Sequence, residues 1–145
     1  MAIEFDSETP EDTYEFGKKL AKEAKPGQVY TLNGDLGAGK TVFAKGFAAG
    51  LGIEDTVSSP TFTILQVYDK GKYPLYHFDV YRIADSSEMD EIGFDEYVFS
   101  DGISLIEWAD NIEDILPARY IRVDITRDLD KGFDHRHILV ESEGE

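Results

Sequence analysis

The chain of 145 residues contains no cysteine, few basic residues and no long apolar stretch. The lack of cysteine excludes a disulfide framework and favours a reducing, cytoplasmic location. No segment approaches the roughly 20 apolar residues that a membrane helix requires, and no charged-then-apolar leader is evident, so we expect neither membrane insertion nor secretion. The sequence has 14 lysines and arginines but 30 acidic residues, so its net charge is −16. Such a surface repels phosphate backbones, which disfavours direct binding to DNA or tRNA.

The length of the chain and the lack of a linker or repeat predict one domain over residues 1–145. Its first helix is expected to begin with Thr9 as N-cap and Pro10 as the first helical residue, and to stop before Pro26. A strand, a loop and a helix followed by several strands predict an α/β fold whose sheet has mixed direction. Further helices are predicted at residues 41–51, 87–99 and 109–116, and strands at residues 29–33, 62–68, 75–80, 103–107, 120–125 and 137–141.

The segment GDLGAGKT, residues 34–41, fits the phosphate-binding pattern G-x-x-x-x-G-K-[ST] and lies between an expected strand and an expected helix. Glycines let such a loop curl, so that backbone N–H groups converge on phosphate oxygens at a helix N-terminus. Lys40 then supplies a positive charge between the outer phosphates, and the Thr41 hydroxyl is suited to Mg²⁺. We therefore predict a single-domain, P-loop NTPase-like, three-layer fold with a mixed parallel and antiparallel sheet, which binds a nucleoside triphosphate. The predicted nucleotide-binding residues of the loop are Asp35, Leu36, Gly37, Ala38, Gly39, Lys40 and Thr41.

Two apolar strands of the predicted sheet end on a carboxylate. LYHFD ends on Asp79, and ISLIE ends on Glu107. A P-loop needs an acid to hold or orient its metal ion, and the pattern leaves open which of the two contacts the metal and which orients water. His77 is interpreted as a packed or hydrogen-bonded strand residue rather than a metal ligand, because no second His or Cys stands at metal-ligand spacing.

The segment SSPTFT contains two threonines close to the start of a predicted strand. Pro60 favours an extended conformation at Ser59, which leaves the hydroxyls of Thr61 and Thr63 at the N-terminal end of that strand. In P-loop NTPases a threonine from such a segment senses the outer phosphate and orders a switch. On these residues alone, a plain Ser/Thr turn is an equal alternative.

Four stretches, GDLGAGKT, SPTFT, HFDVYR and LIEWAD, follow one another in an order and spacing that resemble the TsaE family, also called YjeE. This family is the bacterial ATPase of tRNA threonylcarbamoyladenosine synthesis. The resemblance implies a small mixed α/β P-loop protein that binds ATP and Mg²⁺ and hydrolyses ATP slowly by itself. It also implies that the protein acts together with a complex of TsaD and TsaB, which attaches threonylcarbamoyl to the adenosine beside the anticodon.

The same resemblance assigns roles to individual residues. Thr41 and Glu107 fall at the magnesium positions, and Asp79 matches an acid that assists the metal or the water. Thr61 falls at the switch-like threonine. Together with Lys40, the residues Asp79, Glu107 and Thr61 form the predicted catalytic set.

Two further residues are matched to the nucleotide site by the resemblance. Trp108 corresponds to a tryptophan that follows the family's glutamate, although burial as core filler is an alternative reading of this side chain. Arg136 corresponds to a C-terminal arginine near the nucleotide. Both are therefore expected to belong to the nucleotide-binding residues.

The predicted activity is attack of water on the γ-phosphate of Mg²⁺-bound ATP. No arginine finger is assignable in the sequence, which predicts slow turnover that a partner accelerates. The acidic charge fits a protein that contacts TsaD and TsaB and meets tRNA only indirectly through their complex. Two alternatives remain: a small-molecule P-loop kinase, and a nucleotide-dependent interaction module in which hydrolysis is not essential.

Overall fold

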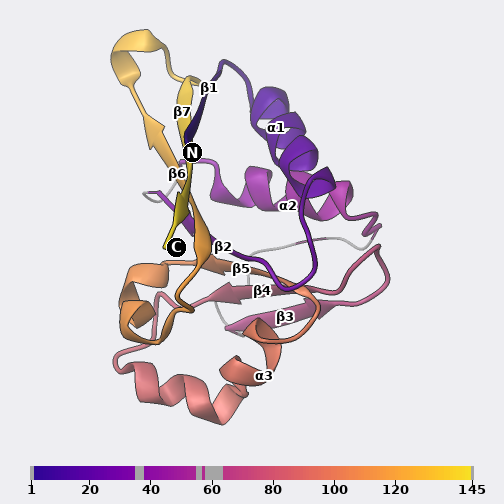
Figure 1. Cartoon of the computed structure of the whole chain (residues 1–145). Helices are drawn as coiled ribbons and strands as arrows, with labels where there is room; N and C mark the ends of the chain where they lie inside the picture. Colours follow the sequence, from indigo (N-terminus) through magenta and orange to yellow (C-terminus); the bar gives the residue numbers. More distant parts are fainter. Residues whose placement is uncertain (1, 35–37, 55–56, 58–63, 145) are drawn as a thin grey trace.

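The computed structural model of the chain describes residues 2–34, 38–54, 57 and 64–144 (Figure 1). Its strands are β1 (Ala2–Ser7), β2 (Val29–Asn33), β3 (Leu65–Tyr68), β4 (Leu75–Asp79), β5 (Ile103–Glu107), β6 (Tyr120–Arg127) and β7 (Arg136–Glu143). Its α-helices are α1 (Pro10–Lys22), α2 (Lys40–Gly50) and α3 (Phe94–Val98), and its 3₁₀ helices are η1 (Ser86–Ile92), η2 (Ala109–Ile115) and η3 (Leu129–Lys131). The seven described strands form one sheet in the order β1-β7-β6-β2-β5-β4-β3.

The sheet combines a parallel centre with antiparallel margins. Strand β2 lies between β5 and β6 and runs parallel to both, and β4 runs parallel to β5. The pairs β1–β7, β6–β7 and β3–β4 are antiparallel. The predicted mixed sheet is therefore confirmed. Because the central strands are parallel, their carboxyl ends meet at one edge, which is where open α/β sheets place their ligand sites.

Helices cover both faces of this sheet, as Figure 1 shows for α1 and α2 on one side and α3 on the other. Side chains of β5 alternate between the two layers: Leu105 packs in the core beneath α2, and Ile106 packs in the core beneath α3. Phe47 of α2 and Phe94 of α3 are both buried in these separate cores. The three-layer prediction is confirmed by this division.

The start of α1 matches the sequence prediction. Thr9 has an extended backbone, and its hydroxyl accepts a hydrogen bond of 3.1 Å from the backbone N–H of Asp12. Pro10 is the first helical residue, where its missing N–H costs nothing. The capping residues therefore fix where the chain enters the helix that covers the sheet.

The structure differs from the predicted elements at three places. The helix predicted over residues 87–99 is divided at Gly93, whose φ of 80° ends η1 and begins α3. The predicted helix at residues 109–116 is a 3₁₀ helix with a kink at Ile112. Strand β1 was not predicted. Of the strand expected at 62–68, the first two residues lie outside the described part of the chain, Ile64 is left-handed with a φ of 67°, and β3 begins only at Leu65. In the described residues, no helix combines the length and apolar character that crossing a membrane demands.

Candidate functional site

The glycine loop connects the last residue of β2, Asn33, to the first residue of α2, Lys40. Its two described glycines are required for different reasons. A Cβ on Gly34 would lie 2.7 Å from the backbone oxygen of Ile125 in β6, so a side chain there would push the loop off the sheet. Gly39 has a φ of 103° and caps α2, a conformation that L side chains rarely adopt. Three of the predicted nucleotide-binding residues, Asp35, Leu36 and Gly37, lie outside the described residues.

Helix α2 presents its N-terminus at the end of this loop. Gly39 caps it without a side-chain hydrogen bond, and its first turn contains no acidic residue. The partial positive charge of a helix N-terminus favours an anion at such a position. Thr41 is exposed in the first turn, whereas Ala38 and Lys40 are buried. The helix end and the Lys40 charge are therefore suited to phosphate.

Asp79 and Glu107, the two predicted acids, lie side by side. They are Cα partners in the parallel pair β4–β5, and both are 3% exposed. Leu32, at the end of β2, is in turn the partner of Glu107, so both acids are level with the point where β2 runs into the glycine loop. Strand alternation directs them to the same face as Leu105, which is the face that α2 covers. The edge of the sheet thus brings two carboxylates to the P-loop.

Each acid has its own hydrogen-bond donor. Asp79 Oδ1 accepts from the backbone N–H of Tyr81 at 3.0 Å. Glu107 Oε2 lies 2.6 Å from Nε2 of His77, and both side chains are buried. The interpretation of His77 as a hydrogen-bonded strand residue is confirmed, while its partner is a finding that the sequence did not indicate.

Trp108 contacts the P-loop lysine and the core at the same time. Lys40 Nζ lies 3.7 Å from the centroid of the indole ring, a cation–π contact. The ring also packs against Tyr81, with ring centroids 4.7 Å apart, and against the core beneath α3. Its backbone is left-handed, with φ of 62° and ψ of 35°, which is uncommon for a bulky residue and marks the residue after Glu107 as a strained position.

Arg136 reaches the P-loop from the first residue of β7. Its Nε donates to the backbone oxygen of Ala38 at 2.9 Å, and its Nη1 donates to the backbone oxygen of Phe133 at 2.9 Å. Burial lowers the pKa of the Arg136 guanidinium below its ordinary value, and the nearby positive charge of Arg127 acts in the same direction. Arg136 therefore ties the last strand to the glycine loop. Thr61, by contrast, lies outside the described residues.

A small pocket of about 60 Å³ adjoins this arginine and the start of α1. It brings together three elements that are distant in the sequence: the first turn of α1, the start of α2 and the end of the β6–β7 connection. The lining residues are Pro10, Thr13, Gly39, Val42, Asp134 and Arg136. The pocket therefore extends from the N-terminus of α2 toward the first helix.

A cluster of Asp6, His135 and His137 fixes β1 against β7 on either side of Arg136. Asp6 Oδ1 lies 3.0 Å from Nδ1 of His137 and 3.2 Å from Nε2 of His135. These hydrogen bonds, that of His137 foremost, hold the pKa of Asp6 below its ordinary value. The cluster thus supports the strand segment from which Arg136 reaches Ala38.

This cluster predicts a pH-dependent contribution to stability. A carboxylate with a lowered pKa in the folded state stabilises the fold above its ordinary pKa of about 3.9, and that contribution is lost as the pH falls through the folded value. Asp6→Asn is expected to lower the melting temperature by a few degrees at pH 7, and the difference from the unmodified protein should be smaller at pH 3 than at pH 7. Thermal unfolding at both pH values checks this, with Glu11→Gln on α1 as the control. An equal loss at both pH values would contradict it.

The donor set at the sheet edge fits Mg²⁺ accompanied by a nucleotide. Magnesium prefers oxygen ligands and is held in proteins mainly by one or two carboxylates and substrate phosphates. Asp79 and Glu107 provide carboxylates, and Thr41 provides a hydroxyl at the start of α2. Over the part of the chain that the structure describes, no group of three or more His, Cys, Asp or Glu side chains could hold a metal alone. The donors therefore suit a metal that arrives with phosphates.

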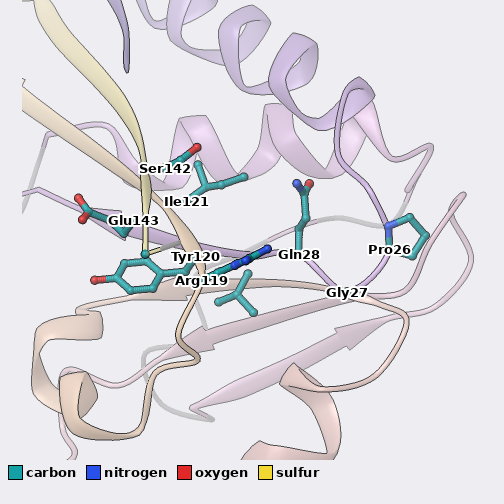
Figure 2. Close-up of a pocket in the computed structure, with 10 residues that line it drawn as sticks. Pro26, Gly27, Gln28, Arg119, Tyr120, Ile121, Ser142 and Glu143 are labelled. Carbon is teal, nitrogen blue, oxygen red and sulfur yellow. The ribbon is translucent and has the colours of Figure 1, made fainter. Parts of the chain in front are cut away.

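A larger pocket of about 340 Å³ lies at the opposite edge of the sheet (Figure 2). Figure 2 shows Gln28 before β2, Tyr120 at the start of β6 and Glu143 at the end of β7 around it. None of the predicted site residues that the structure describes lines this pocket. The size of a pocket therefore does not locate the chemistry here, whereas the strand-end acids and the glycine loop do.

Fold and site together define the class of the molecule as an α/β protein of the P-loop type. The family model described as "Threonylcarbamoyl adenosine biosynthesis protein TsaE" matches residues 7–138, and the chain belongs to the TsaE family.

Similar proteins agree with this assignment. The chain is 51% identical over 135 residues to the tRNA threonylcarbamoyladenosine biosynthesis protein TsaE of Bacillus subtilis, covering 93% of this chain and 82% of that protein. The protein of the same name from Treponema pallidum is 40% identical over 119 residues, which are 82% of this chain and 87% of the relative. The crystal structure of YdiB from Bacillus subtilis superposes with a TM-score of 0.85 at 43% identity, covering all of this chain (100%) and 87% of that one.

Proposed function

We propose that this chain is the Mg²⁺-dependent, ATP-hydrolysing subunit of tRNA threonylcarbamoyladenosine biosynthesis. In this role it serves a complex of TsaD and TsaB proteins, which modifies the adenosine beside the anticodon. The observation that most directly supports the proposal is the pairing of Asp79 and Glu107 at the end of β4 and β5, level with the strand that leads into the glycine loop. A purely structural glycine turn would not require two buried carboxylates beside it.

The phosphates of ATP are proposed to lie at the N-terminus of α2. Backbone N–H groups of the loop and the Lys40 charge stabilise the outer phosphates as negative charge develops there. Bound Mg²⁺ would neutralise phosphate charge, with Thr41 and Glu107 as its protein ligands, directly or through water. Asp79 is then the residue that orients the attacking water, and Thr61 the residue that senses the outer phosphate.

The nucleoside is proposed to extend from the phosphates toward the pocket beside Arg136. Thr13 and Asp134 offer polar groups there, and Val42 offers an apolar contact. Trp108 contacts the Lys40 ammonium, and we propose that nucleotide binding changes the surroundings of the indole ring through this contact. Both positions agree with the nucleotide-binding role that the family resemblance implies.

The charge of the chain supports an indirect relation to tRNA. A net charge of −16 works against contact with a polyanion. The same charge would favour a docking partner with a basic surface, because complementary charges steer association. We therefore propose that contacts are made with TsaD and TsaB, in the cytoplasm, while those proteins hold the RNA.

The proposal is tested by Asp79→Asn, which keeps the shape of the side chain and removes its charge. ATP hydrolysis is measured with and without TsaD, TsaB and tRNA, next to the binding of a non-hydrolysable ATP analogue and the formation of modified tRNA. We expect partner-stimulated hydrolysis in the unmodified protein and a loss of about 10²-fold in the variant, the scale of a lost proton-transfer or water-orienting group. Analogue binding should stay within a few-fold, and tRNA modification should be lost. Asp95→Asn on α3 is the control.

The two alternatives give different results in the same experiment. An interaction module predicts that Asp79→Asn loses hydrolysis while tRNA modification continues. A small-molecule kinase predicts that hydrolysis is indifferent to TsaD and TsaB and that a metabolite accepts the phosphate. Either result would overturn the proposal.

A further inference from the structure

The hydrogen bond between His77 and Glu107 joins two neighbouring strands at the candidate metal site. His77 is 1% exposed and Glu107 is 3% exposed, and their nearest side-chain atoms are 2.6 Å apart. In the β4–β5 register His77 faces Leu105, one pleat before the Asp79–Glu107 pair, so its ring reaches diagonally to the carboxylate. A bond this short and this buried holds its members in one arrangement.

The chemistry of the pair settles which atom donates. A carboxylate accepts only, so Nε2–H of His77 donates to Oε2 of Glu107. The other ring nitrogen, Nδ1, is buried without a hydrogen-bond partner among the described residues. A proton on Nδ1 would be a buried donor without an acceptor, which is costly, so the tautomer with its proton on Nε2 is favoured. In the described structure, the hydrogen bond of the His77 ring is therefore the one that it donates to Glu107.

Asp79 and Glu107 accept hydrogen bonds from different kinds of donor. Asp79 is fixed by a backbone N–H in the turn that follows its own strand, that of Tyr81. Glu107 is fixed by a side chain from the neighbouring strand. With Oε2 engaged by His77, Oε1 is the oxygen that remains to accept from a metal-bound water or to meet the metal.

We propose that His77 is a positioning residue that orients the Glu107 carboxylate toward the Mg²⁺ of the bound nucleotide. The inference rests on the proposed function, because it requires Mg²⁺ and ATP at the P-loop. Residues that hydrogen-bond to metal-binding side chains fix their orientation, and their loss typically lowers metal affinity by about 10- to 100-fold. If His77 only filled space in the core, an apolar residue would fill it as well. Leu75 does so two positions earlier on the same face of β4.

The single tryptophan of the chain provides a direct readout. Trp108 follows Glu107 and contacts Lys40, so its fluorescence is expected to report events at both residues. Mg²⁺ is titrated into protein that holds a non-hydrolysable ATP analogue, and the apparent Mg²⁺ affinity is read from the fluorescence change. The variants are His77→Leu, which removes the donor, and His77→Gln, whose amide N–H stands the same number of bonds from the backbone as Nε2. Leu75→Val is the control for loss of packing in the same strand.

His77→Leu is expected to weaken the apparent Mg²⁺ affinity by about 10- to 100-fold, with analogue binding in the absence of Mg²⁺ unchanged. His77→Gln should recover most of the affinity, and Leu75→Val should leave it unchanged at temperatures where it is folded. If His77→Leu does not fold, His77→Asn takes its place, because its amide is one bond shorter and does not reach Glu107.

Three results would overturn the inference. They are an unchanged Mg²⁺ affinity in His77→Leu or its replacement, a His77→Gln variant as weak as that variant, and an equal loss in Leu75→Val. Each leaves the proposed function intact if the unmodified protein still responds to Mg²⁺ and the analogue. A lack of any such response in the unmodified protein would overturn the proposed function and this inference together.

Discussion

Replacing Lys40 with alanine is expected to lower kcat/KM for ATP by about 10³-fold or more, because removing one electrostatic stabiliser in a water-poor site typically costs 10² to 10³ in kcat alone. Lys40 is 7% exposed and begins α2, so its charge acts in a site of low dielectric constant beside a helix N-terminus. The ground-state phosphates also lose a counter-charge, which adds weaker ATP binding to the slower turnover. ATP hydrolysis in the presence of TsaD and TsaB measures the first effect, and analogue titration measures the second.

Lys45→Ala is the matched control for this variant, because Lys45 lies in the same helix and is exposed. It removes an equal charge from a chain with a net charge of −16, yet it should change hydrolysis less than two-fold. The Lys40 variant should also alter the fluorescence of Trp108, since the ammonium above the indole ring is lost. A Lys40→Ala protein that hydrolyses ATP at the unmodified rate would rule out the phosphate-binding role.

The central strands and the start of the helix after the glycine loop could be predicted because their signals are local. Strands β2 and β5 have the bounds that their short apolar runs predicted, residues 29–33 and 103–107. The glycine pattern also indicated the start of α2, since Gly39 needs a backbone conformation that few other residues adopt. Local backbone preference and the local pattern of apolar residues agree in this part of the chain, so a short stretch of sequence is enough to predict where these elements begin and end.

The contacts between the site residues could be predicted only in part. The sequence indicated that β4 and β5 each end on a carboxylate, but not that the register would make Asp79 the partner of Glu107. His77 could be placed on the face of Asp79 by strand alternation, whereas its bond to Glu107 depends on which strand lies next to β4. Pairing between strands is a non-local property, so neither contact can be read from one segment.

Two other differences have identifiable physical causes. The glycine at position 93 adopts a φ of 80° and divides the helix that was predicted over residues 87–99. An isolated glycine is a signal for such a break. Strand β1 has exposed residues at most of its positions and pairs antiparallel with β7 at the margin of the sheet. Its stability is therefore tertiary in origin, and its apolar content gave no strong strand signal.

Gly46→Ala is expected to destabilise the fold by about 2–3 kcal/mol, the scale of overpacking in a filled core. Helix propensity alone predicts the opposite, since alanine is favoured over glycine by about 1 kcal/mol in a helix interior. The contact with α1 decides whether the substitution stabilises or destabilises the fold. A Cβ at Gly46 would lie 2.0 Å from the backbone oxygen of Tyr14. That oxygen belongs to a helix backbone, so the helices must separate to admit even one methyl group.

The same interface contains two more glycines that act in this way. A Cβ at Gly17 would lie 2.6 Å from the backbone oxygen of Phe43, and one at Gly50 would lie 2.3 Å from that of Lys18. Separation of α1 from α2 at Gly46 would therefore loosen the whole contact, and with it the helix that carries Lys40 and Thr41. Gly46→Ala should accordingly weaken ATP-analogue binding as well as stability.

Thermal unfolding measures the first effect, with an expected decrease of the melting temperature on the order of 10 °C. Gly52→Ala is the matched control, because it makes the same change in the unfolded chain while its Cβ would meet only one atom, at 3.8 Å. Gly52 has a φ of 81°, so this control carries a strain of about 1 kcal/mol and should destabilise less than Gly46→Ala. A Gly46→Ala protein as stable as the unmodified one would mean that α1 and α2 can separate at little cost. In that case the close helix contact would not be what holds the P-loop helix against the sheet.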